Sequence, residues 1–381
     1  MNNSWKSSYQ SLIGFINSNP SIKIEPSKTS IPSEVRPVFY ALFDKARESY
    51  IREYFSDELA AAIKLSEAYT SLTEDIVSVA NLEPEIDLNQ KLTWLIENPM
   101  NGLMRFIYNP LMDFLKGKLD EDEFRERSEF EFISAFKDQY KKGYILWAIL
   151  ALFKLLEPNN LTWVSQKEPN GILSLKELYK QGARVESVPA ITKTSKLTFE
   201  PGTWDTFIVP DLIVYSAKLK KYVAIRRSLP VNTDEPYLVA KQKTTEREWA
   251  SYQQLSNIFN LSNHWPDILI YCDEKLENLN LIADYNHMLH PDMVVGVIPQ
   301  FFSFDSAEIN RTHTYREYLE PFKGTTILFQ DDIPNAVTKA FPPSESTTSK
   351  DQTDTIDSNV FLITSEGFNL QKLGPILEYL M

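Results

Sequence analysis

Apolar residues recur every three or four positions through most of the first 156 residues, which is the spacing of amphipathic helices. The clearest run begins at Pro37, with apolar positions Val38, Phe39, Leu42, Phe43, Ala46, Tyr50 and Tyr54. Further helices are predicted over residues 1–18, Asp57–Leu72, Leu88–Glu97, Met100–Lys116 and Asp120–Leu156, with a break near Gly143. Residues 1–165 are therefore expected to form an all-helical domain.

The pattern changes after Pro169, where β-branched and aromatic runs alternate with turn residues. The predicted strands are Val185–Ala190, Leu197–Phe199, Thr206–Tyr215, Lys221–Arg227, Tyr237–Lys243, Ile268–Cys272, Val294–Ile298 and Thr326–Phe329. Helices are predicted at Leu173–Gln181, Thr244–Phe259 and Glu274–Tyr285. Residues 170–341 are expected to form a mixed α/β domain, so the fold class is α+β.

Residues 342–359 contain almost no apolar side chains and predict a flexible linker. Order is expected to return with a strand at Val360–Thr364 and a helix at Asn369–Met381. This C-terminal element, residues 360–381, either closes the α/β domain or docks onto another protein.

Composition excludes several classes of chemistry. Glycine is scarce, at 11 of 381 residues, and neither Gly-rich phosphate-binding motif occurs. Cys272 is the only cysteine, which excludes an internal disulfide and a thiolate zinc site. His287 and His290 could share a metal only on a helix, which Pro291 would break, so we expect them to lie in a loop or cap.

The most apolar stretch, Tyr144–Leu156, is too short for a bilayer, which needs about 20 residues. It predicts a helix buried inside the protein. The first residues lack a basic segment followed by a long apolar core. We therefore expect a cytoplasmic protein with no membrane partner.

Charge is distributed unevenly. The net charge is −13, which argues against indiscriminate nucleic-acid binding. Between Lys180 and Ala250, however, there are 12 Lys and Arg against 8 Asp and Glu, whereas the rest of the chain has 27 against 44. The candidate footprint for phosphate contacts is the group Lys218, Lys220, Lys221, Arg226, Arg227, Lys241, Lys243 and Arg247. A structural alternative is that hairpin tips and exposed strand faces are often rich in lysine.

Residues Asp205–Ser228 predict a β-hairpin whose first strand carries Pro210-Asp211. Cleavage of a phosphodiester by metal ions needs clustered carboxylates, and a cation or base near the attacking water. Two neighbouring strands supply this arrangement, since residues two apart share a face. With Pro210-Asp211 on one strand, residues 173–298 resemble the PD-(D/E)XK nuclease family, in which a helix and a further strand follow the hairpin.

The resemblance implies an acid at position 226 and a lysine at 228, where this chain has Arg226 and Ser228. An arginine at position 226 would repel a divalent cation. Asp211 would then be the only carboxylate of the motif, and it would bind a metal poorly. The resemblance then implies a catalytically degenerate module without a cofactor. Asp211 could equally be a structural acid that pairs with Arg226 or Arg227 across the hairpin.

An intact site would require residues that have migrated. Glu246 or Glu248, at the start of the predicted helix, could join Asp211 in holding Mg²⁺. Glu235, in the preceding loop, is a further acid. Lys241 or Lys243 could take the place of the missing lysine.

Three functions are consistent with these patterns. The first is a degenerate, nuclease-like component of a multi-protein nucleic-acid-processing or antiviral defence system, which binds DNA or protein subunits. The defence context is implied by the resemblance alone. The second is an active metal-dependent DNA endonuclease. The third is an assembly protein whose basic hairpin is incidental.

Overall fold

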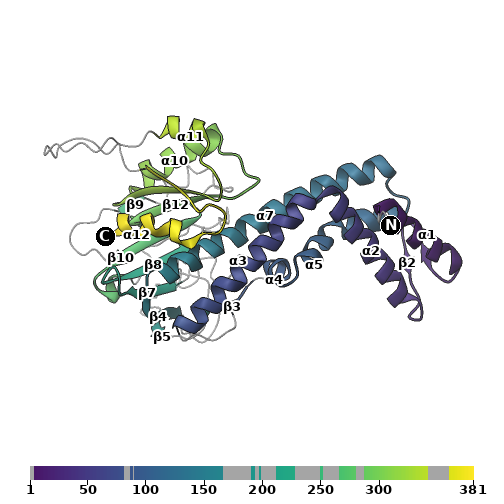
Figure 1. The fold of residues 1–381 in the computed structure, drawn as a ribbon, viewed down its shortest axis with the longest axis horizontal. Coiled ribbons are helices and arrows are strands. Elements are labelled where there is room, and N and C mark those ends of the chain that lie inside the picture. Colours follow the sequence, from purple (N-terminus) through teal and green to yellow (C-terminus); the bar gives the residue numbers. More distant parts are fainter. Residues whose placement is uncertain are drawn as a thin grey trace, which may run out of the picture. The chain divides into compact units, whose positions relative to one another are not determined.

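A computed structural model describes residues 4–80, 86–88, 90–165, 190–193, 197–198, 212–227, 249–251, 266–279, 287–341 and 360–381 (Figure 1). The chain forms two compact units. Unit 1 comprises residues 1–71 and 89–144, and unit 2 comprises residues 72–88 and 145–381. The N-terminal region is helical, and the C-terminal region contains a mixed sheet with helices, which confirms the α+β class.

Unit 1 is built from helices in the order expected from the sequence. They are α1 (Trp5–Ser18), α2 (Arg36–Tyr54), α3 (Ser56–Ala80), α4 (Gln90–Glu97), α5 (Pro99–Met104), η1 (Arg105–Ile107), α6 (Tyr108–Leu115) and α7 (Glu121–Leu155). The helices α3 and α7 each continue into unit 2. A short hairpin, β1 (Lys23–Ile24) with β2 (Thr29–Ser30), was not predicted from the sequence.

Aromatic rings form much of the core of unit 1. Trp5 meets Tyr50 edge-on at 5.1 Å between ring centroids and lies 5.4 Å from Phe124. Further along α7, Phe132 stacks on Phe55 at 3.8 Å. The aromatic side chains at helical spacing therefore hold several helices together, as the pattern indicated.

Gly143 does not break α7, so the expected interruption is wrong. A Cβ atom at this position would lie 2.7 Å from Leu65 Cδ2 and 3.3 Å from Leu92 Cδ1. The absence of a side chain thus allows neighbouring residues to approach α7 closely while its backbone remains helical.

Unit 2 is organised around an eight-stranded sheet in the order β14-β13-β12-β10-β8-β7-β4-β5. Its strands are β4 (Pro158–Ser165), β5 (Ala190–Lys193), β7 (Leu212–Ser216), β8 (Lys221–Arg227), β10 (Ile268–Asp273), β12 (Met293–Ile298), β13 (Gly324–Phe329) and β14 (Val360–Thr364). The pairs β12–β13 and β13–β14 are parallel, and the other neighbours are antiparallel. The expectation that residues 1–165 are all helical is wrong at β4, which lies beyond the last predicted helix and pairs with β7.

Two smaller strand pairs belong to unit 2. β3 (Ile86–Asp87) pairs with β6 (Leu197–Thr198), and β9 (Trp249–Ser251) pairs with β11 (His287–Leu289). The helix predicted over Thr244–Phe259 is therefore wrong at residues 249–251, where pairing with a distant segment prevails over local helical periodicity. At Glu274–Tyr285, the described part is a 3₁₀ turn, η2 (Leu276–Leu279), rather than an α-helix.

Several predicted elements cannot be compared with the structure. The helix Leu173–Gln181, the strand Tyr237–Lys243 and the linker 342–359 lie outside the described residues. Most of Val185–Ala190 and the first half of Thr206–Tyr215 do so as well.

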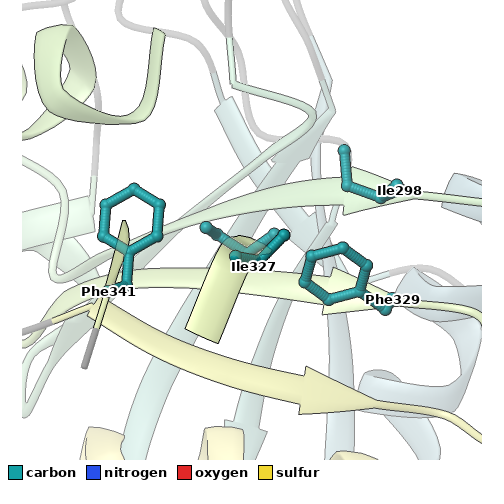
Figure 2. Close-up of a cluster of buried hydrophobic side chains, with 5 residues drawn as sticks. Ile298, Ile327, Phe329 and Phe341 are labelled. Atoms are coloured by element: carbon teal, nitrogen blue, oxygen red, sulfur yellow. The ribbon is translucent and has the colours of Figure 1, made fainter. Parts of the chain in front are cut away.

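The two faces of the sheet are covered by different helices. Ile298, Ile327 and Phe329 form a buried cluster with Val337 and Phe341, at α11 (Asn335–Ala340) and its C-terminal end (Figure 2). Helix α10 (Ser306–Leu319) contributes Ile309 to the same cluster.

The opposite face receives the C-terminal residues. Phe361 is the register partner of Thr326, so alternation directs it away from Ile327 and Phe329. Its ring stacks on Tyr379 of α12 (Gly374–Leu380) at 3.5 Å. The short turn η3 (Leu370–Leu373) leads into α12. Because β14 is an edge strand of the main sheet, this C-terminal element closes the α/β unit.

The apolar run at the end of α7 is buried, as predicted. Ile149, Leu150 and Ala151 are fully buried, and Trp147 meets Phe368 edge-on at 5.2 Å within unit 2. Among the described residues, no helix is long and apolar enough to cross a membrane.

Candidate functional site

The hairpin predicted from the sequence is formed by β7 and β8, with turn residues 217–220. Ser216 fixes this turn, because its hydroxyl donates to Leu156 O at 2.6 Å and accepts from the Leu219 N–H at 3.1 Å. Lys220 adopts a left-handed backbone conformation, with φ of 53°. The turn therefore holds Lys218 and Lys220 exposed at its tip.

Strand β8 lies in the interior of the sheet, between β7 and β10. Val223, Ala224 and Ile225 are buried, whereas Arg226 and Arg227 at its far end are half-buried. These two adjacent arginines point to opposite faces. Arg226 lies five positions after Lys221, a distance of about 17 Å along a strand. The lysines and the arginines of the predicted footprint thus occupy opposite ends of the sheet.

Arg226 and Arg227 both interact with other groups, so neither is a free cation. Arg226 lies near the buried phenol of Tyr271, on the next strand. Burial raises the pKa of Tyr271 well above its ordinary value, the carboxylate of Asp292 raises it further, and Arg226 partly opposes the change. Arg226 therefore interacts with a buried group of the sheet and is not directed only toward solvent.

The lysine-bearing end of the sheet gathers residues from three separate connections. Lys218 and Lys220 lie in the β7–β8 turn and Lys221 directly follows it, whereas Lys275 follows β10 and Lys323 precedes β13. We call these five residues the lysine end. Lys221, Lys275 and Lys323 line one pocket of about 460 Å³. The sequence alone did not identify Lys275 and Lys323, because their proximity depends on the order of the strands.

Carboxylates share this pocket with the lysines. Asp292 is buried, and its Oδ2 accepts from the Cys272 N–H at 2.6 Å. Asp273 accepts from the Lys275 N–H at 2.9 Å, and Glu274 is exposed. Two of the three acids are thus engaged by backbone donors.

The five ammonium groups of the lysine end have no carboxylate partner among the described residues. Lysines elsewhere do form such pairs, as in Lys154 with Asp75 at 2.5 Å and Lys372 with Glu366 at 2.6 Å. The lysine end can therefore accept an external anion without breaking an existing salt bridge.

The residues predicted to carry catalysis cannot be placed. Asp211, Lys241, Lys243, Glu246 and Glu248 lie outside the described residues, as do Ser228, Glu235 and the predicted nucleic-acid contact Arg247. Among the residues that the structure does describe, no group of three or more His, Cys, Asp or Glu side chains is arranged to hold a metal ion.

His287 and His290 do not share a helix. His287 lies in β11, and His290 follows this strand. The buried His290 ring places Nδ1 2.6 Å from Leu319 O, and its Nε2 lies 3.9 Å from Glu320 Oε2.

Comparisons of the chain with protein-family models, with curated proteins and with solved structures gave no match.

Proposed function

We propose that unit 2 is a non-catalytic, nuclease-like module that binds nucleic acid through phosphate contacts at the lysine end. The observation that carries the proposal is the convergence of five lysines from three connections, none of which pairs with a carboxylate in the part of the chain that the structure describes. Binding of this kind is independent of base sequence and weakens as salt rises, because each phosphate contact releases a counterion. The module would serve a larger system that processes nucleic acid, including one for antiviral defence.

The position of the arginines favours binding over cleavage. Arg226, where the nuclease resemblance implies a metal-binding acid, lies close enough to Tyr271 to affect the pKa of the phenol. A cation in this position repels Mg²⁺ and cannot act as its ligand. The lysine end lies at the opposite end of β8, so phosphate contacts there do not depend on a metal site.

A charge-reversal experiment tests the proposal. Wild-type protein should bind a labelled DNA duplex in fluorescence anisotropy, and Lys218→Glu with Lys275→Glu should weaken binding at about 50 mM salt by about tenfold or more. The slope of log affinity against log salt should become shallower by about two, because two phosphate contacts are lost.

The matched control is Lys64→Glu with Lys339→Glu. Both lysines are exposed, and neither belongs to the lysine end. This variant has the same net charge as the test variant and should bind DNA about as well as wild type. Equal loss in the two variants, or no DNA or RNA binding by wild type, would reject the lysine end as a nucleic-acid site and leave the assembly function.

The endonuclease alternative has its own readout in the same preparation. Cleavage of DNA by wild type in Mg²⁺ or Mn²⁺ that is lost in Asp211→Ala would contradict a non-catalytic module. The expected result is intact DNA under all conditions.

A further inference from the structure

A second cleft lies in unit 1, independent of the lysine end. It is lined by the segment after β1, the start of α2, helix α6 and the first turns of α7, and its volume is about 660 Å³. Small-molecule sites typically span about 300–1,000 Å³. Its polar and aromatic lining includes Arg36, Tyr40, Tyr108, Asn109, Asp113 and Lys116.

Cations outnumber acids in this cleft. Arg36, Lys116 and Arg127 face a single acid, Asp113. Both oxygens of Asp113 are already engaged, Oδ2 by Arg127 Nη1 at 2.9 Å and Oδ1 by Lys118 Nζ at 3.3 Å. Burial would raise the pKa of Asp113, but hydrogen bonds from Lys118 and Arg127 outweigh it and lower the pKa. The acid therefore stays ionised and is neutralised by its partners.

The cations are held in different ways. Arg36 donates through Nη2 to Ile31 O at 3.1 Å, which holds its guanidinium against the chain that precedes α2. Arg127 is fixed between Asp113 and Glu131, with Nε 2.7 Å from Glu131 Oε1. Lys116 forms no ion pair with any of the described residues. Arg36 retains further N–H donors, so these two residues can both reach an added anion.

Tyrosine rings and a side-chain amide complete the cleft. Tyr40 and Tyr108 both line it, and the pKa of Tyr108 is raised by burial and by the neighbouring phenol of Tyr40. The guanidinium of Arg47 lies over the Tyr108 ring, 5.3 Å from its centroid. It also donates a hydrogen bond to Met104 O at 2.7 Å. The tyrosine rings make this wall partly apolar, and Asn109 adds an amide that can donate and accept.

We propose that this cleft binds a small phosphate-bearing ligand of up to nucleotide size, with its phosphate groups held by Arg36 and Lys116. Arg127 lines the same cleft, but its guanidinium is already paired with Asp113 and Glu131. The tyrosines supply the flat surface that a base or another ring would contact. Because cations outnumber acids in the cleft, the local positive potential attracts an anion more strongly than isolated exposed lysines do.

Titration calorimetry of the full chain tests this with two probes, tripolyphosphate and ATP. Both should bind wild type, and Lys116→Glu should weaken each by about tenfold or more. Lys116→Arg should retain binding, because it keeps the charge. If the two probes bind with equal affinity, the cleft recognises the phosphate groups alone. If ATP binds more tightly, the cleft also contacts the nucleoside.

Two controls separate the cleft from other lysines. Lys91→Glu, on an exposed position of α4, should leave the titration unchanged. The Lys218→Glu with Lys275→Glu variant should also bind both probes normally, while Lys116→Glu should still bind DNA. Absence of binding by wild type, or the same loss in Lys91→Glu as in Lys116→Glu, would overturn the proposal. Thermal melts of each variant show whether a loss reflects unfolding.

Discussion

Two helical glycines of unit 1 differ in the space around them. In α5, a Cβ atom on Gly102 would lie 2.9 Å from Leu95 Cα and 3.0 Å from Trp94 O, both of which are backbone atoms. In α1, a Cβ atom on Gly14 would have no neighbour within 4 Å. The first glycine permits α4 and α5 to approach closely, whereas the second has no packing role.

These surroundings predict that alanine substitutions at the two positions change the free energy of unfolding in opposite directions. Gly102→Ala should lower the free energy of unfolding by about 1–3 kcal/mol, because the backbone of α4 must move away. Gly14→Ala should raise it by about 0.5–1 kcal/mol, because alanine loses less conformational entropy in a helix. Urea denaturation of both variants measures the effect. A stabilising Gly102→Ala would show that the close approach of α4 and α5 is wrong.

At the scale of elements, two strands of the sheet were predicted with their observed bounds, β8 in its interior and β14 at its edge. Val223, Ala224 and Ile225 are buried on both faces, and the apolar run that results marks β8 clearly. Strand β4 escaped prediction because its sequence, PNNLTWVS, begins with residues typical of turns. Strand β9 was not predicted because its pairing with β11 involves residues almost 40 positions away along the chain.

Part of the candidate site could also be predicted from the sequence. Lys218, Lys220 and Lys221 share one turn and could be found from the sequence. Lys275 and Lys323 join them only because the end of β10 and the start of β13 lie at the same end of the sheet. Arg226 and Arg227 are near the same lysines in sequence, but an extended strand carries them to the other end.

The C-terminal helix yields a prediction of its own. Leu377 of α12 is fully buried, whereas the neighbouring Glu378 is exposed. Leu377→Ala should destabilise unit 2 by about 2–5 kcal/mol, because it leaves a cavity where α12 covers the sheet. Glu378→Ala should change stability by less than about 0.5 kcal/mol. Chemical denaturation that shows equal stability for the two variants would contradict the burial of α12.

At the scale of the molecule, each unit has a core of its own. Unit 1 contains the aromatic cluster around Trp5 and Phe132, and unit 2 contains the sheet with its covering helices. Residues 72–88 belong to unit 2 although they lie within the N-terminal half of the chain. A single boundary read along the sequence could not reveal this discontinuous arrangement.

Separate cores predict two unfolding transitions in calorimetry. Gly102→Ala should shift only the transition of unit 1, and Leu377→Ala only that of unit 2. The helices α3 and α7 contribute residues to both units, so they are the elements through which the transitions could merge. A single transition that both substitutions shift equally would show that the two units unfold together.

The edge position of β14 also affects how the protein is made. Strand β13 receives its second neighbour from residues 360–364, after 30 intervening positions. Until these residues leave the ribosome, β13 presents an unpaired edge, and one face of the sheet lacks α12. Unit 1, complete by residue 144, can fold long before this. During synthesis, unit 2 therefore passes through a stage with exposed apolar surface and a free strand edge, and it is then most open to aggregation and to chaperones.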